Sequence, residues 1–266
     1  MGSAYSSMLV ARSFALCSCM FLVAITACSG KHPESAAQQA PQAQPAAAVQ
    51  KNAELVKRGK LIFDRTPKYA FHYVGNQLAC SDCHVKSGTA DYAAPMIDIA
   101  GLFPMFSKRA GRMITLEDRI DECFARSEAG SPLPPDSLEM QALVAYIQSL
   151  SQNEKRGKPY AGRGLVKLPE LKGNAAQGKL VYVQQECVLC HGRDGAGIPP
   201  IMPPLWGNGS FNDGAGMYKP AKMAAYVFHN MPQNHPGSLT AQQAYDVAAY
   251  IHTMPRPKFN PAYKNY

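Results

Sequence analysis

The chain lacks several features that would settle its class at once. It has no recognisable nucleic-acid-binding module, so its formal charge of +8, from 27 basic and 19 acidic side chains, is best suited to anionic small molecules. It also lacks a comfortable membrane span in its leader, because the apolar run from Phe14 to Ala27 is too short. The 266 residues, 46% of them hydrophobic, are enough for two domains of about a hundred residues each rather than one large core.

The N-terminal segment predicts export rather than a folded domain. Residues 1–28 carry one charge, Arg12, ahead of the apolar run, which is typical of a signal peptide. Ile25-Thr26-Ala27-Cys28 resembles a bacterial lipobox, so we expect a periplasmic lipoprotein that touches a membrane only through a lipid on Cys28. A signal peptide cut elsewhere is the alternative. Residues 29–50, rich in Ala, Gln and Pro, predict a flexible tether.

Two motifs of five residues carry the chemistry, Cys80-Ser81-Asp82-Cys83-His84 and Cys187-Val188-Leu189-Cys190-His191. Two thiols three positions apart on a helical turn can add across the vinyl groups of a heme, and the histidine that follows can bind its iron. A zinc site would need four ligands, whereas each motif supplies three. The sequence therefore predicts two covalently bound c-type hemes, heme 1 at the first motif and heme 2 at the second.

The other cysteines do not suggest a disulfide framework. Of the eight cysteines, four belong to the heme motifs, Cys17 and Cys19 are expected to leave with the signal peptide, and Cys28 is expected to be lipidated. Only Cys123 remains unassigned. A single thiol in an oxidising compartment has no disulfide partner, so Cys123 is expected to be buried, reactive or bound to a metal.

An internal repeat predicts the fold. Gly59-Lys60-Leu61 recurs as Gly178-Lys179-Leu180 before the second motif, and each half closes with a similar helix, around residues 142–147 and 246–251. Helix, heme motif, long loop, ligand and closing helix follow in the same order in both halves. The pattern resembles a mostly α fold, the class I cytochrome c domain, present twice. The expected boundaries are a first domain at 51–151, a surface linker at 152–173, a second domain at 174–257 and a tail at 258–266.

Local signals mark the starts of three helices. Thr115 to Asp118, Asp136 to Glu139 and Thr240 to Gln243 each have the spacing of a capping box. In the first closing helix, Leu143, Ile147 and Leu150 form one apolar stripe and are expected to be core positions.

The second half predicts an electron-transfer heme. Met231 lies 40 residues after His191, just before Pro232, where class I cytochromes place the methionine that binds iron. A thioether ligand stabilises ferrous iron and raises its potential. Four other methionines of this half are rival ligands: Met202, Met217, Met223 and Met254.

The first half predicts a different heme. Cys123 lies 39 residues after His84, so the repeat places a thiol where the other half places its distal ligand. On the predicted helix Arg119, Cys123 and Ser127 are four residues apart and share one face. A thiolate would lower the potential of iron and would itself be an oxidisable sulfur. The alternative is that Met96, Met105 or Met113 binds heme 1 and Cys123 is a core residue.

Three arginines crowd this stretch of the sequence: Arg109, Arg112 and Arg119. Their planar guanidinium groups bind oxyanions better than an ammonium group does. The alternative for each is a solvated arginine or one that pairs with a heme propionate.

Between Leu55 and Pro257 the chain resembles the diheme thiosulfate dehydrogenases and, more distantly, the heme subunits of sulfur-oxidising Sox complexes. The segments that carry the resemblance include Val74-Gly75-Asn76-Gln77-Leu78-Ala79-Cys80, Ile114-Thr115-Leu116-Glu117, Cys123-Phe124-Ala125-Arg126-Ser127, Pro204-Leu205-Trp206-Gly207 and Asn230-Met231-Pro232. The resemblance implies oxidation of two thiosulfates to tetrathionate, with a cytochrome as electron acceptor, a reaction that such enzymes can also run backwards.

The resemblance also assigns roles to individual residues. It implies Cys123 as the distal ligand of heme 1, Met231 as that of heme 2, and Arg109, Arg119 and Ser127 as substrate-binding groups. Some relatives have a lysine before the methionine as an alternative ligand, whereas this chain has Asn230, so no such exchange is expected. Glu128 follows Ser127 and is expected to place a negative charge near the dianion.

Two other functions fit the same motifs. A diheme shuttle of the cytochrome c4 type would have His/Met ligands at both hemes and no substrate. A Sox-type subunit would transfer sulfur to a carrier protein through a modified Cys123. Nothing in the chain supplies the distal residues of a diheme peroxidase.

Overall fold

The computed structural model describes residues 46–151 and 160–266. The predicted signal peptide, the lipidation site at Cys28 and most of the predicted tether lie outside these residues, as does the start of the predicted linker. None of the helices within the described ranges has both the length and the apolar content that crossing a bilayer requires.

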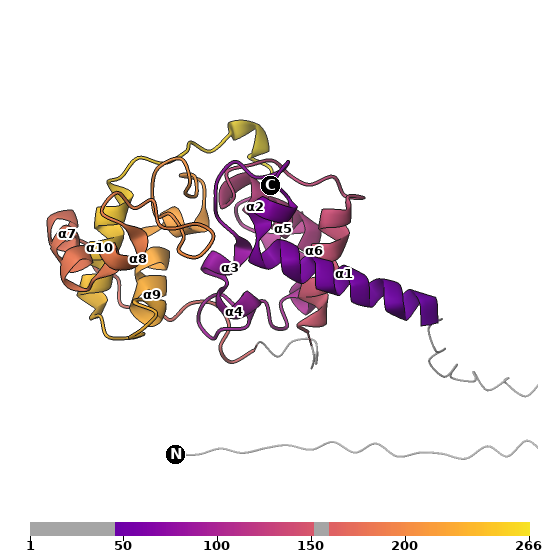
Figure 1. Cartoon of the computed structure of the whole chain (residues 1–266), viewed down its shortest axis with the longest axis horizontal. Helices are drawn as coiled ribbons and strands as arrows, with labels where there is room; N and C mark the ends of the chain where they lie inside the picture. Colours follow the sequence, from indigo (N-terminus) through magenta and orange to yellow (C-terminus); the bar gives the residue numbers. More distant parts are fainter. Residues whose placement is uncertain (1–45, 152–159) are drawn as a thin grey trace, which may run out of the picture. The chain divides into compact units, whose positions relative to one another are not determined.

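The described chain is mostly helical, as predicted (Figure 1). The elements of the first half are α1 (Ala46–Asp64), α2 (Thr66–Tyr69), α3 (Cys80–Cys83), α4 (Val85–Gly88), the 3-10 helix η1 (Ala100–Leu102), strands β1 (Met105–Ser107) and β2 (Arg112–Ile114), α5 (Leu116–Arg126) and α6 (Leu138–Ser149). Those of the second half are α7 (Ala175–Gln184), α8 (Cys187–His191), η2 (Gly216–Tyr218), α9 (Pro220–Asn230), α10 (Ala241–His252) and η3 (Pro261–Tyr263).

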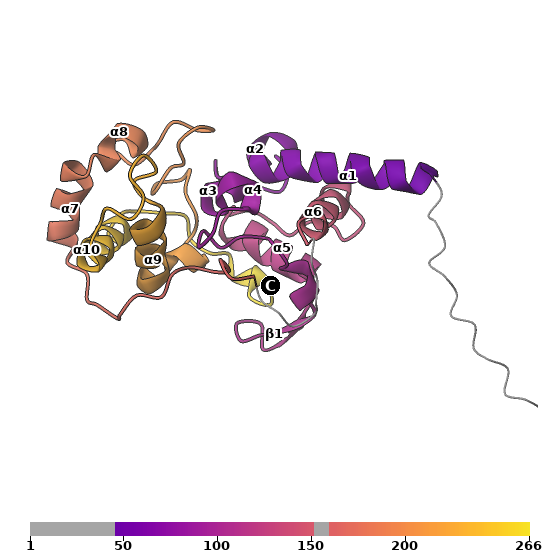
Figure 2. The same cartoon turned by 90° about the horizontal axis from the view of Figure 1, so that it is seen from below.

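Each half is built on a pair of packed helices, α1 with α6 and α7 with α10 (Figures 1 and 2). Within each pair the two helices meet at a glycine, and the two glycines occupy equivalent positions of the repeat. A Cβ atom on Gly59 would lie 1.9 Å from the carbonyl oxygen of Ala142, and one on Gly178 would lie 1.8 Å from that of Asp246. Only glycine permits so close an approach of two backbones, which explains why Gly-Lys-Leu occurs in both halves.

The start of α1 differs from the predicted domain boundary. The helix begins at Ala46 rather than near Lys51, so its first turn lies in the stretch expected to be a tether. Residues 46–50 are Ala-Ala-Ala-Val-Gln, and alanine has the highest helix propensity. A composition that cannot form a core of its own can still extend a helix that is packed further along.

Two of the three predicted capping boxes are confirmed. Thr115 and Asp118 cap α5, and Thr240 and Gln243 cap α10. The prediction for α6 is wrong by one residue, because its N-cap is Ser137, whose hydroxyl accepts a hydrogen bond from the Met140 amide. Asp136 and Ser137 are both good N-cap types, so residue type alone could not choose between them.

Each half has its own apolar core. In the first half Leu143 and Ile147 are buried and Leu150 packs against them, which confirms the predicted stripe. In the second half Tyr182, Trp206 and Tyr250 form a cluster with ring centroids 5.6–5.9 Å apart.

The described part of the predicted linker, residues 160–173, contains no helix and runs along the first half. The amides of Tyr92 and Ala94 each donate a 2.8 Å hydrogen bond to it, to the carbonyls of Gly162 and Gly164. Ala93 forms an antiparallel bridge with Leu165.

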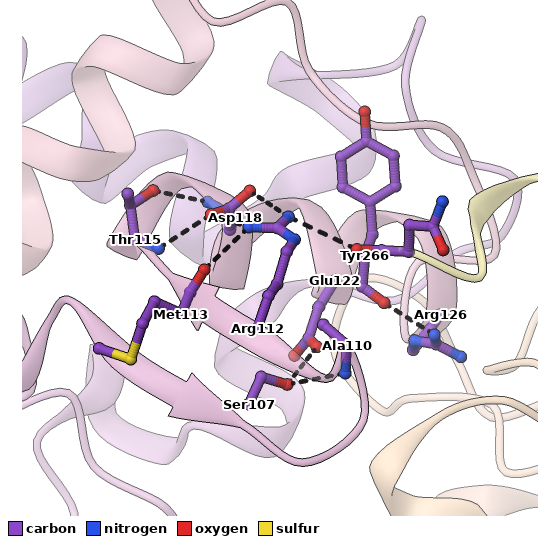
Figure 3. Close-up of polar contacts among 10 residues, drawn as sticks. Ser107, Ala110, Arg112, Met113, Thr115, Asp118, Glu122, Arg126 and Tyr266 are labelled. Carbon is purple, nitrogen blue, oxygen red and sulfur yellow. Dashed lines mark hydrogen bonds and ion pairs between the residues drawn. The ribbon is translucent and has the colours of Figure 1, made fainter.

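The tail at 258–266 packs onto α5. The Arg126 guanidinium lies 4.0 Å from the centroid of the Phe259 ring and donates a 2.8 Å hydrogen bond to the carbonyl of Tyr266 (Figure 3). The helix that carries Cys123 is therefore held in part by the last residues of the described chain.

Candidate functional site

The two motifs orient their histidines in the same way. Nδ1 of His84 is 2.6 Å from the Ala94 carbonyl oxygen, and Nδ1 of His191 is 2.9 Å from that of Pro203. Because a carbonyl oxygen only accepts, Nδ1 of each ring carries the proton and Nε2 keeps a free lone pair. Burial lowers the pKa of His84 to about 4 and also lowers the pKa of His191, so both rings are neutral at pH 7. Both imidazoles are thus prepared to bind iron.

The second motif opens onto a cavity of about 840 Å³. Its walls include Cys187, Cys190, His191 and Met231. Cofactor pockets in proteins are typically about 300–1,000 Å³ and mostly apolar. With two thiols, an imidazole and a thioether on its walls, this cavity fits a covalently bound heme.

The methionines of the second half are not equally placed. Met231 is the C-cap residue of α9 and lines the cavity, as do the rivals Met202, Met217 and Met223. Met223 is 4% exposed and belongs to the apolar core. The position of Met231 at a helix end leaves its side chain unconstrained by a following helical turn.

At the first motif Cys80, Cys83 and Cys123 influence one another electrostatically. Burial is the largest cause of the raised pKa of Cys80, and the charged forms of Glu128, Cys123 and Cys83 raise it further. These mutual effects indicate that the groups lie near one another, and Cys80 Sγ is 4.0 Å from Glu128 Oε1. Cys80, Cys83, His84 and Cys123 therefore form a second set that fits a covalently attached heme with a sulfur ligand.

Cys123 lies inside α5, one turn after Arg119. Burial raises the pKa of its thiol, and the guanidinium of Arg119 and, more weakly, that of Arg109 counteract this shift. In return the Cys123 thiolate is the largest cause of the raised pKa of Arg119. The structure thus brings together three of the predicted site residues, one thiol and two cations.

The rival methionines of the first half lie elsewhere. Met105 and Met113 are on the β1–β2 ribbon and are 37% and 54% exposed. Met96 packs against Gly88 and belongs to the apolar core. This placement favours Cys123 as the distal sulfur.

The three arginines have different partners. Arg119 Nη1 lies 2.6 Å from Glu122 Oε2, and the Glu122 side chain is 5% exposed while that of Arg119 is 45% exposed. Arg112 instead forms two hydrogen bonds of 2.8 and 2.9 Å with the Asp118 carboxylate (Figure 3). Arg112 thus engages its carboxylate with both terminal nitrogens, whereas Arg119 engages Glu122 through Nη1 alone, which favours Arg119 over Arg112 as a group for an anionic ligand.

Ser127 is the C-cap residue of α5. Its amide donates a 2.7 Å hydrogen bond to the Cys123 carbonyl, and its own carbonyl accepts one of 2.7 Å from Asn76 Nδ2. The predicted spacing of one turn from Cys123 is correct, and the backbone of Ser127 is fixed on both sides.

Glu128, expected to place a negative charge near the dianion, is buried. Its side chain is 2% exposed, and burial raises its pKa well above the usual value, an effect that Asp82 strengthens. A buried carboxyl without a cationic partner takes up a proton rather than remain charged. Burial therefore favours the protonated form of Glu128, in which it would not repel an anion.

Three residues important for the site escaped sequence reasoning. Glu122 holds Arg119, as described above. Lys222 on α9 has a pKa lowered by burial first and then by the positive charges of Arg119, Lys219 and Arg109, so it stands beside the same cations. Tyr226 on α9 lines the cavity of the second motif. A helical spacing of three from Arg119 could have indicated Glu122, but no local signal indicates the other two.

Two family models match the two halves. One, described as "SoxA/TsdA, cytochrome c domain", matches residues 70–155, and the model "Cytochrome c" matches residues 175–255. The chain is thus two cytochrome c domains in tandem.

Curated relatives match most of the chain. A thiosulfate dehydrogenase from Allochromatium vinosum is 40% identical over 216 residues, 77% of this chain and 80% of that protein. One from Stutzerimonas stutzeri is 38% identical over 211 residues, 77% of this chain and 68% of that protein.

A solved structure has the same fold. The thiosulfate dehydrogenase TsdBA from Marichromatium purpuratum, in its as-isolated form, matches with a TM-score of 0.74 and 32% sequence identity over 77% of this chain. The present chain spans 47% of the length of that solved chain.

Proposed function

The chain belongs to the thiosulfate dehydrogenase family of diheme cytochromes c, and from this premise we propose that it oxidises two thiosulfate ions to one tetrathionate ion. The observation that carries the proposal is the group formed by Cys123, Arg119 and Arg109 beside the first motif. A plain electron shuttle has no need of a buried thiol among cations. The second half, with Met231 on the cavity wall, has no such group among its described lining residues.

Two covalently bound hemes c belong to this function. Heme 1 would be held by Cys80, Cys83, His84 and Cys123. Heme 2 would be held by four residues of the second half, Cys187, Cys190, His191 and Met231. When bound, the two hemes accept the two electrons that the reaction releases, and a cytochrome takes these electrons from heme 2.

Cations are required because the substrates repel each other. Two dianions about 4 Å apart repel by roughly 16 kcal/mol at an effective dielectric constant near 20, four times the value for two unit charges. Arg109 and Arg119 supply two positive charges near Cys123, Lys222 supplies a third near these arginines, and the paired Glu122 removes one. In its protonated form, which burial favours, Glu128 would add no repulsion.

Cys123 would carry the reaction in two balanced steps. Its thiolate forms a bond with the outer sulfur of one thiosulfate. The two electrons that this oxidation releases would go to the two bound hemes. The second thiosulfate then attacks that same outer sulfur, the bond to Cys123 breaks, and tetrathionate leaves with the thiolate restored. Arg119, fixed by Glu122, and Arg109 bind the sulfonate oxygens and lower the charge that the attacking ion meets. The same steps in reverse would reduce tetrathionate.

Anaerobic mixing of the oxidised protein with thiosulfate tests the proposal. We expect thiosulfate to reduce the hemes, as followed by their absorbance, and tetrathionate to form. In Cys123→Gly we expect neither heme reduction nor tetrathionate, with two hemes still bound. Ser149→Ala, on the closing helix α6, is a control that should leave both unchanged. Retained turnover in Cys123→Gly would exclude this role of the thiol. Hemes that thiosulfate never reduces would favour an electron-transfer cytochrome without a substrate.

We also propose that the protein is exported to the periplasm and lipid-anchored through Cys28. The sequence at 25–28 supports this proposal. Membrane fractionation of cells that express the whole chain should place it with the membranes, and Cys28→Ser should release it in soluble form. An unchanged distribution of Cys28→Ser would contradict the anchor.

A further inference from the structure

Tyr226 joins the second half to the first heme motif. It lies on α9 and is 6% exposed. Its hydroxyl donates a 2.9 Å hydrogen bond to the backbone carbonyl of Asp82, which stands between Cys80 and Cys83 in the attachment turn of heme 1. A buried tyrosine hydroxyl normally requires such a partner. Here the partner comes from the other domain.

The same side chain forms part of the cavity for heme 2. That cavity is lined by Tyr226, Val227 and Met231 from the second half and also by Ser81, Asp82 and Cys83 from the first motif. The attachment turn of heme 1 is therefore a wall of the site for heme 2. Tyr226 is the residue on this wall that has a hydrogen bond across the domain boundary and also faces the cavity.

The end of α9 is fixed at two further points. Asn230 Nδ2 lies 3.3 Å from the Tyr92 carbonyl oxygen, and the rings of His229 and Tyr92 meet edge to face with centroids 5.1 Å apart. Met231 follows directly. The segment that presents the distal ligand of heme 2 is thus held against the domain of heme 1.

We propose that Tyr226 is the bridging residue for electron transfer between the two hemes. One electron leaves ferrous heme 1, which becomes ferric, and reaches ferric heme 2, which becomes ferrous. The electron passes from the Cys83 thioether along the backbone to the Asp82 carbonyl, across the hydrogen bond and through the phenol ring. Tyr226 is neither oxidised nor deprotonated. A bonded path of this kind transmits an electron better than an open gap of equal length.

The chain offers a matched control. Tyr182 is also buried and lines the same cavity, and its hydroxyl donates a 2.8 Å hydrogen bond to the Gly192 carbonyl. Tyr182→Phe and Tyr226→Phe therefore remove the same atom and the same kind of bond from the same cavity. Only Tyr226→Phe loses a hydrogen bond to the first heme motif.

The experiment is flash photoreduction of the fully oxidised diheme protein without thiosulfate. The rate at which an electron redistributes between the hemes is followed in a phase that does not depend on protein concentration. The methionine–iron band reports the redox state of heme 2, and the spectrum of the thiolate-ligated iron reports that of heme 1. The proposal rests on the two hemes and not on the substrate, so a failure here would leave the proposed thiosulfate oxidation untouched.

We expect Tyr226→Phe to slow this phase, with both heme potentials and the optical spectra unchanged, and Tyr182→Phe to retain the original rate. If Tyr226→Phe does not accumulate with two hemes, Tyr226→His, which is too short to reach the Asp82 carbonyl, should slow the same phase. An unchanged rate in the Tyr226 variant overturns the proposal. Equal slowing in both variants, or slowing that the heme potentials explain, overturns it as well.

Discussion

Arg119 offers a sharp test of the anion site, because its partner and its exposure are both defined. One nitrogen faces Glu122 at 2.6 Å, and 45% of the side chain is exposed, so other N–H donors are free for a ligand. Two hydrogen bonds to a charged ligand contribute about 1.5–3 kcal/mol each, or roughly 3–6 kcal/mol together. At about 1.4 kcal/mol for each factor of ten, Arg119→Gln should lower kcat/KM for thiosulfate by roughly 10²–10⁴.

Arg112→Gln is the control, since it removes the same charge from a residue bound to Asp118. We expect it to change kcat/KM by less than about threefold, the effect of a distant charge that salt screens. The assay is the initial rate of acceptor reduction over a range of thiosulfate concentrations. If Arg119→Gln behaves like Arg112→Gln, Arg119 does not bind the substrate and the reasoning is refuted.

The partner of Arg119 adds a second arm to this test. In Arg119→Gln the Glu122 carboxylate, 5% exposed, loses its cation and stands unpaired near the dianion. An unpaired buried charge is costly, although the exposure of Arg119 makes the cost smaller than for a fully buried pair. Adding Glu122→Gln should therefore restore part of the lost kcat/KM, by about 1–2 kcal/mol or roughly tenfold. No recovery would mean that the two side chains act independently.

Three further outcomes follow from the structure. Met231→Gly should abolish the methionine–iron band of heme 2 and slow reduction of the acceptor cytochrome while both hemes stay attached, and a persisting band would point to Met202, Met217 or Met223. Because burial, Arg119, Lys219 and Arg109 lower the pKa of Lys222 while Glu122 opposes them, this lysine loses its proton at a lower pH than usual, so KM for thiosulfate should rise on the alkaline side. Lys222→Arg should flatten that rise, and an identical pH profile would contradict it. Gly178→Ala should lower the free energy of unfolding by about 1–3 kcal/mol or more in denaturant titrations, since its Cβ would clash with the Asp246 carbonyl. Gly216→Ala should be tolerated, because its Cβ would meet only Lys222 Nζ, at 3.8 Å.

Sequence reasoning succeeded where the signal is local or repeated. The cysteines and histidine of each motif act within one helical turn, and the closing helices recur in both halves, so their places could be predicted. The cap of α5 was correct because Thr115 and Asp118 satisfy each other within four residues. The fold class followed from these local features and their common order.

The rest of the site depends on contacts that the sequence does not encode locally. Lys222 approaches Arg119 from the other domain, and Tyr226 finds its acceptor in a turn of the first motif. The raised pKa of Glu128 could not be predicted from its residue type, because burial, which only the fold determines, is its main cause. Residue type gives the chemistry that is available, and packing decides which protonation state is present.

The equal spacing of the two distal residues hides a difference that bears on their roles. Cys123 and Met231 lie at nearly the same distance along the chain from their histidines, and α5 and α9 both have 11 residues. Yet Cys123 is inside α5, whereas Met231 follows the end of α9. A thiol fixed within a helix keeps a set distance from Arg119, one turn earlier, so sulfur and cation meet the substrate as one unit. A thioether at a helix end is placed instead by the contacts of that end, and these reach the domain of heme 1 through Asn230 and Tyr226. The first arrangement suits chemistry on a bound anion, and the second suits an electron relay whose ligand is held by the domain that delivers the electrons.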